Sequence, residues 1–275
     1  MPRTPDDGAG FRLVAAVRRY PLIAYCVLLA AASWPVMVGA PYAVFLVGPS
    51  VCAFVVVGIT HGRRGVRELW GRVLRWRVPA RYYLVALVGL GAYLFATTYT
   101  VVLLVRPGQL VGWSLTSALL TSAVNIVPVL VMVGLGEEFG WRGFALPRLQ
   151  DRHGPLVASL VVGLLWAVWH WPLRIVEGGV STDLVWTTVG ITAASCLYTW
   201  MFNSTGGSVL LVALMHAAEN TWVGVPFEVV FDAGSPGFRD AFAVREIAFV
   251  VLVVVVVLVT RGRLGLRRHA PVRST

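Results

Sequence analysis

Two adjacent carboxylates, Glu137 and Glu138, stand at the end of a stretch that is otherwise uncharged. The preceding residues 119–135 hold no ionisable side chain, and Arg142 follows Glu138 by four positions. Ionisable groups inside an apolar segment are costly and usually mark a functional site. A poorly solvated carboxylate can serve as a general base near neutral pH. The sequence therefore indicates acid–base chemistry in an apolar environment.

Two histidines and an asparagine further along the chain could complete such a site. His170 and His216 both lie in apolar runs, and Asn220 follows His216 by one helical turn, so the last two share a helix face. A histidine can help to hold and deprotonate a water molecule, and histidine and asparagine donors can stabilise an oxyanion. Glu138 and Arg142 can form an i, i+4 ion pair, which leaves Glu137, about 100° around the helix, to face a cavity.

The same atoms allow a metal mechanism. Glu137, His170 and His216 could hold zinc with an open position for water. The His-Glu-x-x-His pattern is absent, and the segment 216–220 has Asn220 where an inverted zinc motif needs histidine. Glu219 is either a ligand or a carboxylate paired elsewhere. The sequence thus leaves zinc and metal-free water activation both open.

The composition places these residues in a membrane. The 275 residues are 57% hydrophobic and 13% charged, with a mean hydropathy of +0.76. Repeated apolar runs of about 20 residues predict membrane-spanning helices. The formal net charge is +10 and all 23 basic residues are arginine. Because they cluster between the apolar runs, anionic lipid head groups are the expected partner and nucleic acid is not. The three cysteines lie within apolar runs, which speaks against a disulfide frame.

We expect an all-α, polytopic protein of about eight transmembrane helices, forming one membrane domain over residues 1–275. Within it we expect a cytoplasmic arm (1–19), a basic amphipathic interfacial segment (61–81), a catalytic core (117–223) and a basic cytoplasmic tail (261–275). The expected spans are about 20–38, 42–60, 82–105, 117 into the Glu-Glu motif, 155–173, 184–202, 208–223 and 247–260.

The segment 61–81 carries seven arginines and an apolar stripe. Val66, Leu69, Trp70, Val73 and Leu74 follow helical spacing, and arginines occupy the other face. This pattern favours a helix lying in the membrane interface over a loop helix packed on protein.

The arginines also predict the orientation of the chain. With eight spans, 19 arginines fall on one side and four, Arg106, Arg174, Arg239 and Arg245, on the other. The positive-inside rule then places both termini in the cytoplasm. An Arg-rich, Ala/Val/Gly-rich chain suggests a GC-rich bacterium, so we expect a multi-pass protein of the bacterial inner (plasma) membrane.

Helix lengths predict that the candidate residues meet. If the chain turns at residues 153–155, Glu137 and His170 each lie about 15 residues, or ~22 Å, from the turn. A helix that starts after Gly206-Gly207 reaches His216 after ~14 Å and Asn220 after ~20 Å. Three helices therefore bring the four side chains to similar depths.

At these residues the sequence resembles the CPBP family of intramembrane proteases, also called the CAAX protease or bacteriocin-processing (Abi) family. The family's Glu-Glu-x-x-x-Arg motif matches residues 137–142, and its His-x-x-x-Asn motif matches residues 216–220. Its Phe-x-x-x-His motif matches residues 166–170, with Trp166 in place of phenylalanine. The three motifs occur in order over about 85 residues.

The resemblance implies eight helices around a cavity open to the cytoplasm. It implies an endopeptidase in which Glu137 acts as the base, His170 assists, and His216 and Asn220 form the oxyanion hole. Some family members cut prenylated CAAX proteins, so the implied substrate is a membrane-associated or lipidated peptide or protein. Other members are linked to bacteriocin maturation or self-immunity.

Two other classes of function fit the same residues. A non-catalytic membrane protein could bind a peptide or partner in the cavity, as in bacteriocin self-immunity. A proton-coupled transporter could use the carboxylate and histidines as a relay, although no inverted repeat is visible. The proteolytic reading is favoured by the three motifs together.

Overall fold

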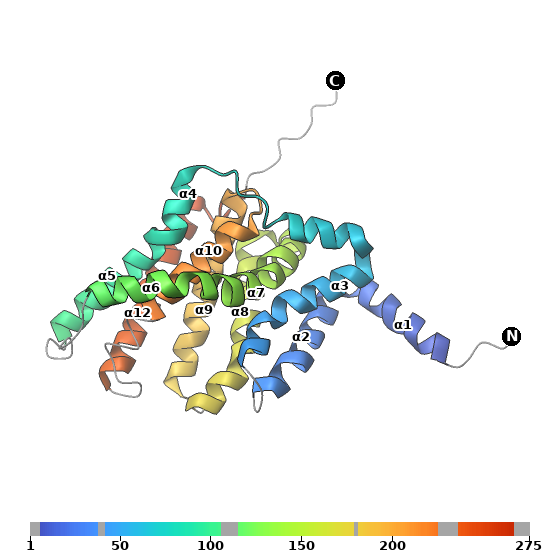
Figure 1. Cartoon of the computed structure of the whole chain (residues 1–275), viewed down its shortest axis with the longest axis horizontal. Helices are drawn as coiled ribbons and strands as arrows, with labels where there is room; N and C mark the ends of the chain where they lie inside the picture. Colours follow the sequence, from blue (N-terminus) through green and yellow to red (C-terminus); the bar gives the residue numbers. More distant parts are fainter. Residues whose placement is uncertain (1–5, 38–41, 106–114, 179–180, 225–235, 267–275) are drawn as a thin grey trace, which may run out of the picture.

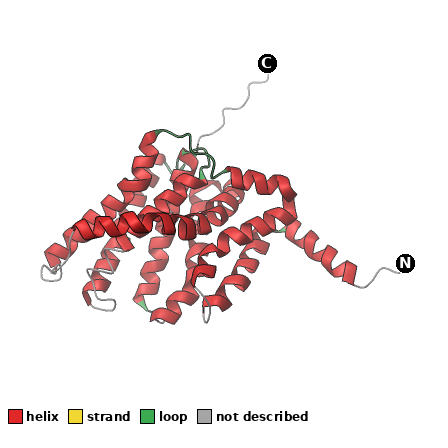
Figure 2. Ribbon diagram, viewed as in Figure 1, coloured by secondary structure: helices red, strands yellow, loops and turns green. Residues whose placement is uncertain are grey.

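The computed structural model describes residues 6–37, 42–105, 115–178, 181–224 and 236–266. These residues are helical almost throughout, and none of them forms a strand (Figure 2). Four helical stretches are long and apolar enough to cross a membrane, or five if the pair 10–19 and 21–36, bent by 113°, counts as one. The expected all-α membrane protein is confirmed, and the count of eight spans stays a prediction.

The elements are labelled in Figure 1. In chain order the helices are α1 (Asp6–Arg19), α2 (Pro21–Met37), α3 (Tyr42–Gly71), α4 (Ala80–Leu84), α5 (Leu90–Val105), α6 (Leu115–Val129), α7 (Gly136–Glu138), α8 (Leu146–Gly178), α9 (Thr182–Ser204), α10 (Val209–Glu219) and α12 (Pro236–Thr260). Segments of π-helix join several of them: η1 (Val85–Gly89), η3 (Leu130–Leu135), η4 (Phe139–Ala145) and η5 (Asn220–Gly224).

The helices form one bundle in which α9 packs against both α8 and α12, and α2 packs against α3 (Figure 1). Helix α10 packs against η3, which leads into the Glu-Glu motif. The core of the bundle is apolar and includes Tyr25, Trp141, Phe144 and Tyr198, none of which is more than 1% exposed. This packing brings the three motif-bearing segments together in the interior.

The expected turn before the fifth span occurs at Gly154. Its backbone has φ 74° and ψ 170°, a left-handed conformation that favours glycine, and it breaks the long helical stretch α8 in two. The second part of α8 therefore runs antiparallel to the segment with Glu137. Ser208 starts α10 and caps it by accepting a hydrogen bond from the backbone N–H of Leu211 at 3.3 Å.

Two glycines beside the motif allow helices to approach closely. A Cβ atom on Gly134 would lie 2.6 Å from the backbone oxygen of Ala213, and one on Gly136 would lie 2.7 Å from the oxygen of Leu46. Small residues at helix contacts are typical of membrane bundles. Here they draw α10 and α3 against the Glu-Glu segment.

The motif carboxylates lie between two π-helical segments. Glu137 and Glu138 belong to the single turn α7, which η3 precedes and η4 follows, and Asn220 begins η5. Such π turns are rare and often occur at functional sites. The sequence analysis treated these stretches as regular α-helix, so it missed the local change in helical pitch.

The basic segment 61–81 is helical as far as Gly71 and again from Ala80, where α4 begins. Helix α3 bends at Gly62, where φ is 59°, and its last part packs against η4. Leu69 is 4% exposed, and the Trp70 ring stacks on Phe139 with centroids 5.5 Å apart. Leu74, expected on the same helical face, lies beyond the helix and is exposed. The stripe thus packs partly on protein, and its contact with lipid stays a prediction.

Three arginines lie elsewhere than expected. Arg142, counted among the arginines of the cytoplasmic side, is fully buried in the bundle. Arg174 and Arg245, assigned to loops, belong to α8 and to α12, which begins at Pro236 rather than near residue 247. Parts of the arm 1–19 and the tail 261–275, and the loop with Arg106, fall outside the described residues.

Candidate active site

Glu138 holds both an arginine and a histidine in the interior. Arg142 Nη1 donates to both carboxylate oxygens of Glu138, at 2.8 and 3.0 Å. His216 Nδ1 lies 2.9 Å from Glu138 Oε1. The predicted i, i+4 ion pair of Glu138 and Arg142 is therefore present. Glu138 also contacts His216, which the sequence spacing did not predict. Because a carboxylate only accepts, it fixes the proton of His216 on Nδ1 and orients the ring.

The guanidinium of Arg142 is enclosed by aromatic rings. It lies over Trp166, 4.6 Å from the ring centroid, and over Tyr198 at 4.8 Å. The side chains of Arg142 and Glu138 are both fully buried. Contact with aromatic faces partly replaces the lost hydration of the cation. This cation therefore belongs to the framework of the site, and solvent does not reach it.

Glu137 is held by Trp166. The indole Nε1 donates to Glu137 Oε2 at 2.6 Å, and the carboxylate is 2% exposed. Trp166 is the residue that replaces phenylalanine in the second motif, and phenylalanine has no donor to offer. The sequence analysis assigned this position no function, although the presence of an indole N–H beside an isolated carboxylate could have signalled one.

His170 is oriented by the same tryptophan. Its Nδ1 lies 2.9 Å from the backbone oxygen of Trp166, one turn earlier in α8. A carbonyl only accepts, so Nδ1 carries the proton and Nε2 is the acceptor in the neutral ring. Such a ring can receive a proton through Nε2. The histidine is half-buried, with Trp169 edge-on at a centroid distance of 4.7 Å.

Asn220 completes the group on the third helix. Its Nδ2 donates to the backbone oxygen of His216 at 3.1 Å, and the amide carries a second N–H for another acceptor. The His216 ring packs against Trp166 and Tyr198, with centroids 5.2 and 5.3 Å apart. The structure thus brings together all six predicted site residues, with Trp166 at the centre.

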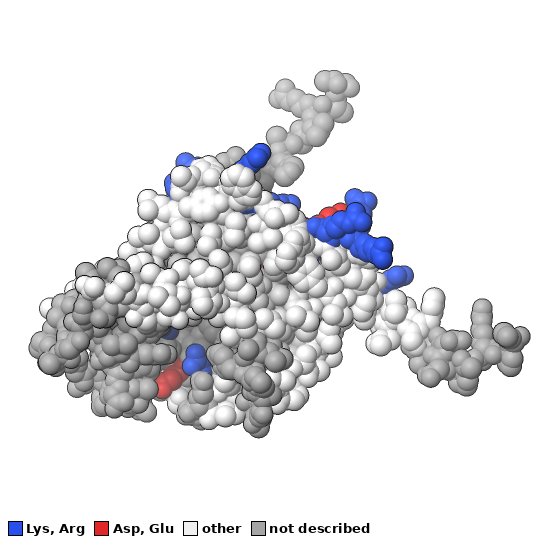
Figure 3. Space-filling model, in the orientation of Figure 1, with Lys and Arg blue, Asp and Glu red and all other residues white. Residues whose placement is uncertain are grey.

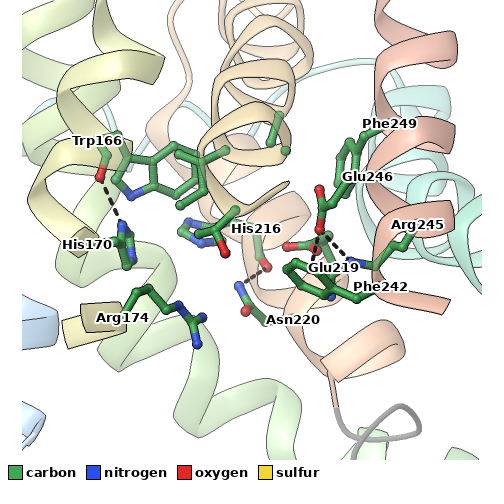
Figure 4. A pocket seen from close by; sticks show the side chains of 14 residues that line it. Trp166, His170, Arg174, His216, Glu219, Asn220, Phe242, Arg245, Glu246 and Phe249 are labelled. Atoms are coloured by element: carbon green, nitrogen blue, oxygen red, sulfur yellow. Dashed lines mark hydrogen bonds and ion pairs between the residues drawn. The ribbon is translucent and has the colours of Figure 1, made fainter. Parts of the chain in front are cut away.

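A pocket of about 270 Å³ opens beside these residues, and Trp166, His170, His216 and Asn220 line it. Glu137, Glu138 and Arg142 do not line it; they lie behind Trp166 and His216. Figure 4 shows Trp166 and His170 on one side of this pocket and Asn220 below His216.

The far wall of the pocket is charged. Glu219, Arg245 and Glu246 line it, whereas Arg174 lies on the side of His170, one turn further along α8 (Figure 4). Arg245 and Glu246 form an ion pair in which Glu246 is almost fully buried. Glu219 therefore faces the pocket, and both roles considered for it, ligand and ion-pair partner, stay hypotheses. The sequence analysis did not include Arg174, Arg245 or Glu246 in the site because they were assigned to loops.

Zinc does not fit this arrangement. In the described parts of the chain, no three His, Cys, Asp or Glu side chains lie close enough together to hold a metal ion. The trio Glu137, His170 and His216 is among the side chains that this criterion does not group, and we derive no step through a metal.

The fold and the site together define a polytopic helical membrane protein in which carboxylates, two imidazoles and an amide from three segments lie in and beside one pocket. A comparison with known proteins identifies a family with a similar sequence. Residues 119–222 match the family of type II CAAX prenyl endopeptidases described as Rce1-like. All three motifs lie within that segment, so the resemblance to the CAAX protease (CPBP) family is confirmed.

The chain is also similar to a curated protein, CAAX prenyl protease 2 of Methanococcus maripaludis. The two are 30% identical over 109 residues, which cover 36% of this chain and 40% of the relative. The chain thus matches about two fifths of the length of that relative.

Proposed function

We propose that the protein is an endopeptidase that hydrolyses a peptide bond within the membrane, using water activated by Glu137. The observation that carries this proposal is the convergence of the three motifs around Trp166, which donates a hydrogen bond to Glu137 and whose backbone oxygen accepts one from His170. The similarity of residues 119–222 to CAAX prenyl endopeptidases supports the same reaction class.

In the proposed reaction, Glu137 takes a proton from water while the water oxygen attacks the carbonyl carbon of the scissile bond. His170, with its proton on Nδ1, helps to position that water through Nε2. The charge that develops on the carbonyl oxygen is stabilised by the second N–H of Asn220 and by His216. Glu137 then passes its proton to the amide nitrogen, the C–N bond breaks, and a carboxylic acid and an amine leave.

Glu138 and Arg142 act indirectly. Donation from Nδ1 of His216 to Glu138 leaves Nε2 as the atom directed elsewhere, and a protonated ring donates from both nitrogens. The Glu138 carboxylate stabilises that protonated ring as negative charge forms on the substrate. Arg142 holds the carboxylate of Glu138 in place through two hydrogen bonds.

The proposed substrate is a peptide or protein held at the membrane, with or without a lipid group. The curated relative is named for prenylated CAAX substrates, so a lipidated peptide is one arm of the test. The other arm is the same peptide without its lipid.

The test compares purified wild-type protein with Glu137→Gln on a fluorogenic peptide in detergent. Glutamine keeps the shape and the bond to Trp166 but cannot take the proton, so we expect cleavage to fall by about 100- to 10,000-fold. Replacing a buried carboxylate should leave the fold at least as stable. Equal cleavage by the two proteins would refute the assignment of the base. If the protein is instead a non-catalytic membrane protein that binds peptides, it will bind the peptide without cleaving it. If it is a proton-coupled transporter, Glu137→Gln will change its proton flux.

A further inference from the structure

Three arginines lie together at a small hollow where α3 ends. The hollow has a volume of about 100 Å³, and Arg72, just after α3, and Arg148, in the first turn of α8, both line it. Arg75 lies beside Arg72, because the Nη1 atoms of these two residues are 2.8 and 3.2 Å from the position that a Cβ atom on Gly207 would occupy. We call Arg72, Arg75 and Arg148 the arginine cluster.

The arginine cluster holds like charges close to one another. Burial and the positive charges of Arg75 and Arg148 lower the pKa of Arg72. The carboxylate of Glu68, which also lines the hollow, offsets this in part, but it is paired with Arg64 at 2.9 Å. Among the residues that the structure describes, no carboxylate forms an ion pair with a member of the cluster. Cations that repel one another at a partly buried place are stabilised by a bound anion.

The protein positions these side chains without using all of their donors. Arg148 Nη1 donates to the backbone oxygen of Phe144 at 2.9 Å, and its guanidinium lies 3.9 Å from the centroid of the Phe144 ring. The guanidinium of Arg72 lies over the Phe202 ring at 5.6 Å. Arg75 Nη1 donates to a backbone oxygen of the turn before α10. A guanidinium has five N–H donors, so each arginine keeps donors for the oxygens of an anion.

The backbone beneath the cluster is fixed to the start of α10. The N–H of Val209 donates to the backbone oxygen of Arg72 at 3.1 Å, and Ser208 Oγ donates to that of Arg75 at 2.8 Å. Gly207 is buried with φ 83°, a conformation that favours glycine, and a side chain there would collide with both guanidinium groups. The cluster is therefore preorganised, which lowers the entropic cost of binding a ligand.

The surroundings of the cluster indicate which anion it meets. Trp70, Leu74 and Trp76, in the same segment, are 55%, 65% and 56% exposed. Figure 3 shows basic side chains gathered in the upper part of the molecule, where α3 ends and α4 begins. Exposed tryptophan among arginines is typical of segments at the depth of lipid head groups. Arginine suits phosphate because its planar group donates two parallel hydrogen bonds. The anion that a membrane offers at this depth is the phosphate of a phospholipid.

We infer that the arginine cluster binds the phosphate of one anionic phospholipid head group. Arg72 and Arg148 donate to it from two sides of the hollow, and Arg75 adds positive charge beside them. The bound lipid joins the end of α3 to the first turns of α8 and α10, and so ties together segments that lead to the three motifs. The inference does not depend on the proposed peptidase function, because no member of the cluster belongs to the proposed site.

The first experiment counts the lipids that the full chain retains in detergent. Phosphatidylglycerol or phosphatidylcholine with the same acyl chains is added, and native mass spectrometry measures the bound lipid. We expect the wild type to retain one phosphatidylglycerol in preference to phosphatidylcholine. Arg72→Gln and Arg148→Gln should each lower the affinity for it by about 10- to 100-fold, because a hydrogen bond to a charged group typically accounts for a change of this size.

The matched control is Arg67→Gln. Arg67 is exposed on α3 and does not line the hollow, and the substitution removes the same charge. We expect this variant to retain phosphatidylglycerol like the wild type. An equal loss of affinity in all three variants would show a general attraction between charges and would overturn the inference, as would equal retention of the two lipids by the wild type.

The second experiment needs no variant, so it decides even if Arg72→Gln or Arg148→Gln does not fold. The melting temperature of the wild type in detergent is measured with phosphatidylglycerol and, separately, with inorganic phosphate at the same concentration. A ligand that binds only the folded protein raises the melting temperature, and we expect a rise with the lipid and none with inorganic phosphate. A rise with inorganic phosphate at least as large assigns the cluster to a free anion and overturns the lipid assignment. No rise with phosphatidylglycerol overturns it as well.

Discussion

The indole N–H of Trp166 donates to Oε2 of Glu137 at 2.6 Å, and the same tryptophan lines the pocket. Trp166 therefore both orients the carboxylate and separates it from the pocket. Its backbone oxygen holds His170, so one residue sets the position of two proposed catalytic groups. The motif that the sequence resembles has phenylalanine at this position, which could not make the bond to Glu137.

Removal of this bond should slow catalysis. We expect Trp166→Phe to lower kcat by about 10- to 100-fold, since a hydrogen bond to a charged group contributes ~1.5–3 kcal/mol. The matched control is Trp171→Phe, because Trp171 Nε1 donates to a neutral hydroxyl, Thr188 Oγ1, at 3.0 Å and not to the Glu137 carboxylate. Both variants are compared by peptide cleavage and by thermal melting. If Trp166→Phe retains the kcat of Trp171→Phe, the tryptophan does not position the base.

The buried pair of Glu138 and Arg142 should matter for stability. Arg142→Ala leaves the carboxylate of Glu138 buried without its cation, which typically costs ~3–5 kcal/mol. Arg64→Ala removes an i, i+4 ion pair of the same kind with Glu68, but that pair is exposed and its loss should change little. Melting temperatures in detergent compare the two. An Arg142→Ala protein that melts like the wild type but does not cleave would assign Arg142 a direct role in the reaction.

Asn220 should act on the transition state. We expect Asn220→Ala to lower kcat by ~100- to 1,000-fold with little change in KM, because the lost N–H would serve the oxyanion more than the bound substrate. Asn125→Ala is the control, since Asn125 is half-buried on α6 and donates to the backbone oxygen of Thr121 one turn away. A rise in KM at unchanged kcat would instead show that Asn220 binds the substrate.

Activity should not depend on zinc. In the described parts of the chain, the three candidate ligands Glu137, His170 and His216 are not grouped as a metal site. We therefore expect purified protein to cleave peptide at an unchanged rate after dialysis against a strong chelator. Elemental analysis of wild type, His170→Ala and His216→Ala provides the second readout. Stoichiometric zinc in the wild type that both substitutions remove would establish a metal mechanism.

The sequence by itself determined the class of the fold and predicted which residues lie near one another in the proposed site. Apolar runs of membrane length predict helices because the bilayer leaves backbone groups no partner except those within the helix. The spacing of Glu138 and Arg142 predicts their ion pair because side chains four residues apart share a helix face. The turn at Gly154 and the similar depths of His170 and His216 follow from helix rise alone. Each of these features depends on local geometry, which a sequence specifies directly.

Only the tertiary structure decided which atoms of the proposed site form hydrogen bonds and which residues line the pocket. The bonds of Glu138 to His216 and of Trp166 to Glu137 join residues 78 and 29 positions apart, so they depend on how the helices rotate against one another. The π-helical segments beside the motif change that rotation, and the sequence pattern did not predict them. The charged residues Arg174, Arg245 and Glu246 line the pocket because α8 and α12 extend into the supposed loops. Helix rotation and helix ends are set by packing between segments, which is why the sequence placed the residues at one depth but did not show which atoms meet.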